Sequence, residues 1–159
     1  MGRILIIRPL LFIAGGAATG FLSLVFSSVI SLVFPSESGY FPLFVLVLVE
    51  EIAKFFGLTL LLIKEGPKIS SGIALILFGA LPFGLGFGLF EMGLILLSSR
   101  TIPSGALAIV VIHLITAVIL SLAVYSFKFK KRESVGYVLI LLAVLIHMWY
   151  NTFVISVVH

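Results

Sequence analysis

Long apolar runs separated by short polar breaks dominate the chain. A helix needs about 20 apolar residues to cross the ~30 Å hydrocarbon core of a bilayer. Five runs reach that length, at residues 9–34, 41–63, 69–97, 104–127 and 135–158. Glycine, proline, serine and charged residues fill the breaks, as is typical of turns. The pattern predicts an all-α polytopic membrane protein with about five transmembrane helices, and a single integral membrane domain over residues 1–159.

Composition narrows the possible functions. The chain is 62% hydrophobic and 10% charged, with a mean hydropathy of +1.37, so lipid must be its main solvent. It has no cysteine and its six acidic residues are all glutamates, which excludes disulfides, thiolate metal sites and paired-aspartate proteolysis. The net charge of +4 does not indicate a nucleic-acid partner, because most cations lie at the ends of apolar runs.

The distribution of positive charge predicts an orientation. Of the ten lysines and arginines, Lys54 lies within an apolar run and Arg100 lies alone on one side. The other eight fall on the opposite side: Arg3, Arg8, Lys64, Lys68, Lys128, Lys130, Lys131 and Arg132. The positive-inside rule then places the N-terminus in the cytoplasm and the C-terminus outside. We expect an integral protein of a prokaryotic cytoplasmic membrane.

Ionisable residues inside the apolar runs are the candidates for function. Each costs roughly 2.5–3.5 kcal/mol at the centre of a membrane helix on insertion scales, so such residues usually have a role. Counting ~1.5 Å of rise per residue from the outer end of each run puts five of the polar groups about 10–18 Å deep, namely Glu50, Glu91, His113, His147 and Asn151. A shared depth predicts one buried site on four helices. The polar residues concerned are Glu50, Glu51, Lys54, Glu91, His113, His147 and Asn151.

Four short patterns occur in order on the last four predicted helices. They are EEIAK at residues 50–54, FGLFE at 87–91, the single His113, and HMWYN at 147–151. The first two resemble the EExxK and FxxxE patterns of PrsW-type glutamic intramembrane proteases. That family is similar to the CAAX-protease and bacteriocin-processing superfamily, and distantly to the gamma-secretase scaffold subunit. The resemblance covers residues 41–158, which implies a four-helix protease-like core with the helix at 9–34 as an addition.

Two departures distinguish the chain from the CAAX-protease branch. Glu91 stands where those enzymes have a histidine, and Lys54 comes one position before their arginine. The chain therefore resembles the PrsW branch more closely, and a prenylated substrate is not implied. The resemblance implies an intramembrane endopeptidase that cleaves a membrane-embedded protein or peptide.

The resemblance also implies catalytic roles. Glu50 would activate water, and Glu91 would share that water or protonate the leaving amine. His147 and Asn151 match the positions that hold the oxyanion, and two donors on one helix face suit this task.

The remaining residues would support those roles. Glu51 and Lys54 would fix the base, His113 would orient water or substrate, and Phe87 belongs to the second pattern. Because Glu50 and Lys54 are four residues apart, they share a helix face and can also pair directly.

Three alternatives remain open at this point. The expected cofactor is none, but Glu50, Glu91, His113 and His147 are ligand types that suit a catalytic zinc. A non-catalytic scaffold could keep polar residues for helix packing. A proton-coupled carrier could use carboxylates and histidines as a relay, although no inverted repeat is visible.

Glycines form two further patterns. Gly16 and Gly20 make a GxxxG pattern that either packs the first helix on the core or forms a homodimer. Gly84, Gly86 and Gly88 superficially resemble a phosphate-binding loop, but they lie in a membrane run after Pro82 with no preceding strand. Close helix packing or a kink is the interpretation we favour there.

Overall fold

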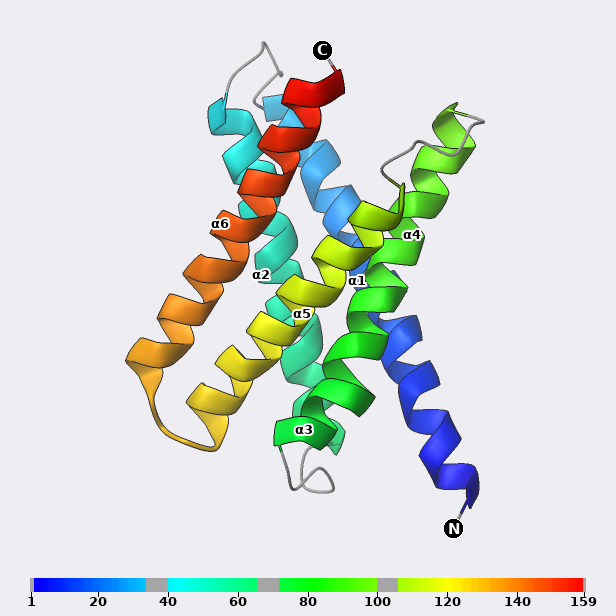
Figure 1. The fold of residues 1–159 in the computed structure, drawn as a ribbon, viewed down its shortest axis with the longest axis vertical. Helices are drawn as coiled ribbons and strands as arrows, with labels where there is room; N and C mark the ends of the chain where they lie inside the picture. The colour runs from blue at the N-terminus through cyan, green and yellow to red at the C-terminus, as the bar shows by residue number, and fades with distance from the viewer. Residues whose placement is uncertain (1, 34–39, 66–71, 100–105, 159) are drawn as a thin grey trace.

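Every element in the described part of the chain is helical. The computed structural model describes residues 2–33, 40–65, 72–99 and 106–158. Its elements are α1 (Gly2–Val33), α2 (Tyr40–Glu65), α3 (Gly72–Leu75), the π-helical η2 (Ile76–Ala80), α4 (Leu81–Ser99), α5 (Ala106–Lys128) and α6 (Glu133–Val158) (Figure 1). The all-α class is confirmed. The predicted turns at 35–39, 66–68 and 100–103, and the terminal His159, lie outside the described residues.

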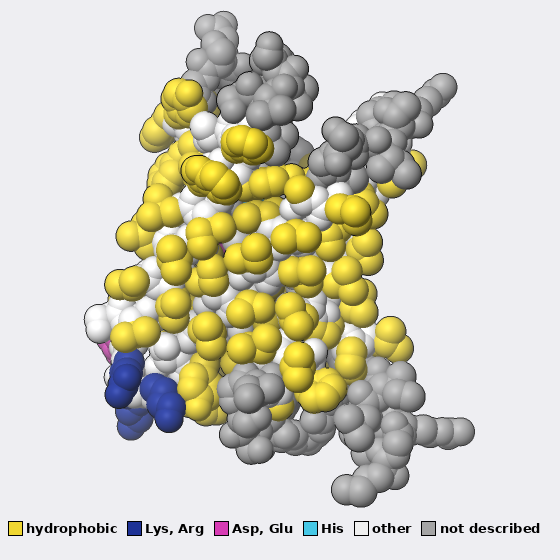
Figure 2. All heavy atoms as spheres, viewed as in Figure 1, with side chains coloured by type: hydrophobic (Ala, Val, Ile, Leu, Met, Phe, Trp, Pro, Cys, Tyr) yellow, Lys and Arg dark blue, Asp and Glu magenta, His cyan; other side chains and the backbone are white. Residues whose placement is uncertain are grey.

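The helices have the length and surface of membrane spans. Four described stretches are long and apolar enough to cross a bilayer: Pro9–Leu32, Ile76–Ser98, Leu107–Lys128 and Glu133–Phe153. The 26-residue α2 is ~39 Å long, sufficient to cross as well, but charged residues occupy its middle. Hydrophobic side chains cover the visible surface between the two ends of the bundle (Figure 2). The protein is therefore a polytopic integral membrane protein, as the sequence predicted.

Successive long helices run in alternating directions. As a result, α1 begins and α6 ends at opposite ends of the bundle (Figure 1). The longest helix contact is between α1 and α4, and α1 also lies against α2. α5 packs against both α4 and α6, and it contacts α2. The additional first helix is thus packed against α4 and α2.

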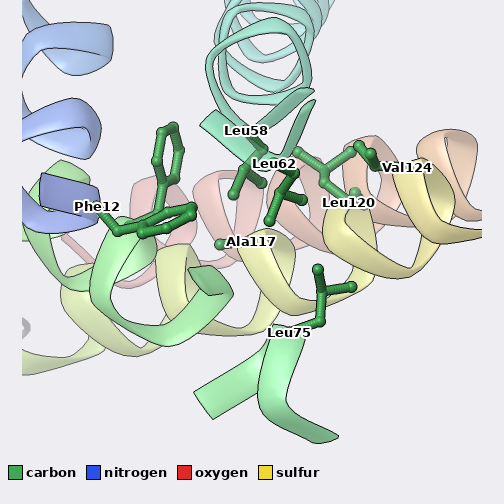
Figure 3. Close-up of a cluster of buried hydrophobic side chains, with 9 residues drawn as sticks. Phe12, Leu58, Leu62, Leu75, Ala117, Leu120 and Val124 are labelled. Carbon is green, nitrogen blue, oxygen red and sulfur yellow. The ribbon is translucent and has the colours of Figure 1, made fainter. Parts of the chain in front are cut away.

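A hydrophobic core fills the half of the bundle nearer the start of α1. Its side chains come from all the long helices and from α3, and none is more than 2% exposed. They are Phe12, Leu58, Leu62, Leu75, Phe83, Ala117, Leu120, Val124 and Ala143 (Figure 3). Because burial against protein here replaces contact with lipid, dispersion and close packing hold this core together.

The inward faces of the helices change from apolar to polar partway along their length. On α2, Leu58 belongs to the core, whereas Lys54 and Glu51, one and two turns earlier on the same face, are buried and charged. α5 repeats the change between Leu120 and His113, which share a face and are both buried. The polar halves lie at the same end of the bundle, away from the start of α1 (Figure 1).

The predicted helix at 69–97 contains a wider turn. Pro82 has no amide hydrogen, and its ring would clash with the carbonyl group four residues earlier in a regular α-helix. Immediately before it, the η2 segment is π-helical, and the amide of Leu81 donates to the carbonyl of Ile76, five residues back. An inserted residue of this kind is a common way to relieve such strain. The expected kink near Pro82 therefore takes the form of a π turn.

Glycines let α4 approach both of its neighbours at backbone distance. A Cβ added to Gly84 would lie 2.6 Å from the carbonyl oxygen of His113 on α5. A Cβ on Gly86 would overlap the carbonyl group of Ile13 on α1. The glycine run of α4 is thus a packing surface, as we favoured from the sequence.

The GxxxG pattern of α1 serves the same contact from the other side. Gly16 and Gly20 are both buried, and a Cβ on Gly16 would overlap the carbonyl oxygen of Phe83 on α4. Packing within the chain therefore accounts for the pattern. A homodimer through Gly16 and Gly20 stays a hypothesis, and it would require α1 to leave α4.

Replacing Gly86 with alanine should destabilise the bundle. The added methyl group must push α1 away from α4, and overpacking of this kind costs about 1–3 kcal/mol. Gly93→Ala on the same helix is the matched control, because a Cβ there meets nothing within 4 Å. We expect Gly86→Ala to lower the free energy of unfolding in mixed micelles and Gly93→Ala to leave it unchanged or slightly raised. Equal effects would contradict this packing.

Candidate active site

Six ionisable side chains from four helices form one connected set of contacts. Each lies on the polar half of its helix, just beyond the hydrophobic core. We refer to the set as the polar cluster, and its members are Glu50, Glu51 and Lys54 from α2, Glu91 from α4, His113 from α5 and His147 from α6. The single buried site expected from the shared depth of these residues is therefore present as a geometric arrangement.

Glu51 is the centre of the polar cluster. One carboxylate oxygen, Oε1, accepts hydrogen bonds from Lys54 Nζ at 2.5 Å and from His147 Nδ1 at 2.6 Å. Lys54 Nζ also donates to Thr116 Oγ1 at 3.2 Å, and it lies 4.6 Å from the centre of the Phe87 ring. The ammonium group is thus enclosed by a carboxylate, a hydroxyl group and an aromatic face, all of which favour a cation.

His147 links the two adjacent glutamates of α2. Its Nδ1 lies at hydrogen-bonding distance from Glu51, and its Nε2 is 3.5 Å from Oε2 of Glu50. If Nδ1 carries the proton that is donated to Glu51, then Nε2 can donate as well only when the ring is an imidazolium. Each ring nitrogen of His147 therefore faces one of the two glutamates of α2.

A second carboxylate–imidazole pair lies beside the first. His113 Nε2 is hydrogen-bonded to Glu91 Oε2, which joins α5 to α4. The His113 ring also contacts Phe87, with 4.7 Å between ring centres, and meets the His147 ring edge-on at 5.2 Å. Phe87 therefore contacts both Lys54 and His113.

Exposure differs sharply among the members of the polar cluster. The side chains of Glu51, Lys54 and His113 are 0% exposed, and that of His147 is 1% exposed. Glu50 and Glu91, in contrast, keep 23% and 36% of their side-chain surface accessible. Glu50 and Glu91 are thus the two members at the edge of the cluster, whereas the other four are enclosed.

Three buried polar atoms of the cluster have no hydrogen-bond partner among the described residues. They are Oε2 of Glu50, Oε2 of Glu51 and Nδ1 of His113. Leaving such a group unpaired costs about 1–3 kcal/mol. Unpaired buried atoms are a common feature of functional sites, and these three favour a polar guest at the cluster.

The donor set fits a metal ion only in part. Glu51, His113 and His147 place one ligand atom each within 4.8 Å of one another. This set differs from the zinc ligands considered from the sequence, because it takes Glu51 in place of Glu50 and Glu91. The Lys54 ammonium group already lies 2.5 Å from Glu51 Oε1, so a second cation at that carboxylate would be repelled.

The geometry corrects the predicted partner of Lys54, and it leaves Asn151 outside the contacts of the polar cluster. Lys54 forms its close ion pair with Glu51, three residues away, and not with Glu50 as the four-residue spacing suggested. Asn151 lies one turn beyond His147 on α6 and is half-buried, but it makes no hydrogen bond to any described residue.

Thr116 is a residue that the sequence patterns missed. Its side chain is fully buried, accepts from Lys54 and donates to the carbonyl oxygen of His113 at 3.5 Å. The available signal was its spacing, because a threonine three residues after His113 shares a helix face with it.

Searches against protein-family models, curated proteins and solved structures gave no match to this chain.

Removing the Lys54 charge should destabilise the fold more than an ordinary surface substitution does. In Lys54→Met, the Glu51 carboxylate stays buried without its ammonium partner, and breaking a buried ion pair costs about 3–5 kcal/mol. The double variant Glu51→Gln/Lys54→Met removes both charges, so we expect it to regain most of that loss. Unfolding in mixed micelles measures both.

Lys64→Met is the matched control, because Lys64 is an exposed lysine of the same helix. We expect its unfolding free energy to change by less than about 0.5 kcal/mol. A neutral Lys54→Met variant would contradict the pairing, as would a double variant no more stable than the single one.

Proposed function

We propose that this protein is an intramembrane endopeptidase of the glutamate type, which hydrolyses a peptide bond in a membrane-embedded protein or peptide. The polar cluster carries the proposal. Three glutamates, two histidines and a lysine from four helices meet inside a bundle whose outer surface is apolar. Ionisable groups at such depth are costly in lipid, so a chain that gathers six of them has a chemical use for them.

Glu50 is the proposed general base. It lies at the accessible edge of the cluster, and its buried Oε2 makes no hydrogen bond to a described residue. It is therefore free to accept a proton from water. Glu51 is unsuited to that role, because it is fully enclosed and its Oε1 already accepts two hydrogen bonds. We assign Glu51 and Lys54 to positioning the base, because Lys54 holds Glu51 and Glu51 holds His147, which lies beside Glu50.

His147 is the proposed oxyanion donor. Glu51 fixes its ring through Nδ1, which leaves Nε2 directed at the space beside Glu50. A hydrogen-bond donor near the attacked carbonyl group stabilises the negative charge that develops there, which is a large term in catalysis of acyl transfer. Asn151, one turn further along α6, would add a second donor once a substrate lies beside it.

Glu91 and His113 form the proposed acid. In the complete step, Glu50 removes one proton from water, and the resulting hydroxide attacks the carbonyl carbon to give a tetrahedral oxyanion. Collapse of that intermediate breaks the C–N bond, and a proton from the Glu91–His113 pair goes to the leaving amine. The proton held on Glu50 then passes to the Glu91–His113 pair, which restores both groups and leaves water divided between the new carboxyl group and the new amino group.

The direction of the chain in the membrane follows from charge and is part of the proposal. The exposed cations of the α5–α6 turn lie at the end where α1 begins (Figures 1 and 2). The positive-inside rule assigns that end to the cytoplasm of a prokaryotic cell. The polar cluster then lies towards the outer leaflet, and α6 ends outside.

Glu50→Gln should abolish peptide hydrolysis while the protein stays folded. The amide keeps the shape of the side chain but cannot take a proton, and loss of a general base lowers rates by about 10²–10⁴. In the assay, the protein and transmembrane peptides are reconstituted together in liposomes and incubated in H₂¹⁸O. Mass spectrometry then detects the peptide products. Each new carboxyl terminus should gain one ¹⁸O atom.

Glu133→Gln, on the exposed end of α6, is the matched control and should cleave normally. Full activity of Glu50→Gln would overturn the assignment of the base. Proton-driven solute uptake by the same liposomes, without any peptide product, would favour the carrier alternative.

Chelators should not inhibit the reaction. Lys54 already supplies the positive charge at Glu51, so the proposed chemistry needs no metal ion. We expect 1,10-phenanthroline to leave the cleavage rate within twofold of the untreated value, and purified protein to contain no stoichiometric zinc. Inhibition that added zinc reverses would instead assign Glu51, His113 and His147 as metal ligands.

A further inference from the structure

A second feature lies at the opposite end of the helices from the polar cluster. A cavity of about 320 Å³ opens between α2, α5 and α6. Its lining residues are Phe55, Thr59, Val124, Phe127, Lys128, Tyr137 and Ile140. Thr59 is five residues beyond Lys54 on α2, ~7.5 Å along the helix axis, and no lining residue belongs to the polar cluster. The cavity is therefore distinct from the proposed catalytic site.

The walls of the cavity are apolar and well ordered by contacts between rings. Phe127 meets Phe55 edge-on at 5.9 Å between ring centres, and it meets Tyr137 edge-on at 5.1 Å. The absence of a side chain at Gly136 makes room for the Phe127 ring. Such walls suit a hydrocarbon chain.

One polar group of the cavity has no partner. Thr59 Oγ1 is buried and makes no hydrogen bond to any described residue. A guest with an ester or phosphate oxygen near the apolar part would satisfy it.

Positive charge gathers at the end of the bundle where the cavity lies. Lys128 belongs to the lining, and the turn that follows it adds Lys130, Lys131 and Arg132, all exposed. Figure 2 shows lysine and arginine side chains gathered at this end of the bundle. Lys131 has a left-handed φ of 51°, and the Arg132 amide donates to the Ser126 carbonyl at 3.0 Å, so the turn has a defined shape. Glu133, the next residue along the chain, offsets one of these four cations.

We propose that this cavity and the basic turn bind one anionic phospholipid. An acyl chain would fill the apolar space, and the phosphate group would lie on Lys128 and the cations of the turn. Basic pockets between transmembrane helices are suited to anionic headgroups on the cytoplasmic side. A soluble anion has no hydrocarbon part that could pack against the aromatic walls. A zwitterionic lipid has no net charge for the turn to attract. The proposal does not depend on the proposed protease activity.

Lipid binding to the purified full-length protein tests the proposal directly. Native mass spectrometry in mild detergent would compare dioleoyl phosphatidylglycerol with dioleoyl phosphatidylcholine at equal concentrations. We expect the phosphatidylglycerol complex to form at least tenfold more readily and to raise the unfolding temperature, because a ligand that binds only the folded state stabilises it. Equal binding of the two lipids would overturn the proposal.

Two variants locate the bound lipid. Lys128→Gln should weaken phosphatidylglycerol binding about fivefold, the effect of one cation at a membrane surface, and Ile140→Phe should weaken it by filling the cavity. Lys64→Gln removes the same charge from an exposed residue outside the lining and should have no effect. Unfolding of each variant without lipid confirms that it folds. If Ile140→Phe does not fold, Lys128→Gln still tests the site, because it changes an exposed residue.

Three other results would count against the site. An equal loss with Lys64→Gln would mean that binding reflects general surface charge. Unchanged binding in Lys128→Gln would remove the mouth of the cavity from the interaction. The same rise in unfolding temperature with inorganic phosphate alone would mean that the turn binds phosphate and not lipid.

Discussion

A carboxylate buried in a membrane protein needs a positive charge beside it, and Lys54 supplies that charge to Glu51. An unpaired buried ion costs several kcal/mol, so burying the charge of either residue without the other would destabilise the folded protein. The two residues are one turn apart on α2, and each also binds a second helix. Glu51 accepts from His147 on α6, and Lys54 donates to Thr116 on α5. Three helices are thus held at a common level by one ion pair. The glycine contacts of α4 with α1 and α5 bring the fourth helix and its Glu91 to that level.

The same ion pair separates the roles of two neighbouring glutamates. Glu51 is enclosed and satisfied on one oxygen, whereas Glu50 points 100° away on the helix and keeps accessible surface. In the proposed function, one of these adjacent carboxylates is a structural group and the other is the reactive group. In the proposed enzyme, His147 connects them, because each of its ring nitrogens faces a different glutamate. The hydrophobic core closes one side of the cluster, so in the proposed enzyme water and substrate would reach it from the other side.

Much of this arrangement follows from the sequence. The lengths of the apolar runs predicted the helices. The common depth of Glu50, Glu91, His113 and His147 within those runs predicted that the four side chains would meet. The exact pairing did not follow, because residues three and four apart are both neighbours on a helix face and only the partner helices decide between them. Lys54 turns to Glu51 because Thr116 and Phe87 hold its ammonium group on that side. The π turn before Pro82 and the role of Thr116 depend on how α4 and α5 pack, which spacing along one helix does not determine.

The contact between Glu51 and His147 joins α2 to α6 across 96 residues of chain, and its energy can be measured without a substrate. A double-mutant cycle with Glu51→Gln, His147→Gln and the double variant, followed by unfolding in mixed micelles, isolates that energy. Residues that share a buried network couple by about 0.5–3 kcal/mol, and we expect a value in that range here. Additive effects of the two substitutions would mean that the side chains do not meet, and the polar cluster would not exist as described.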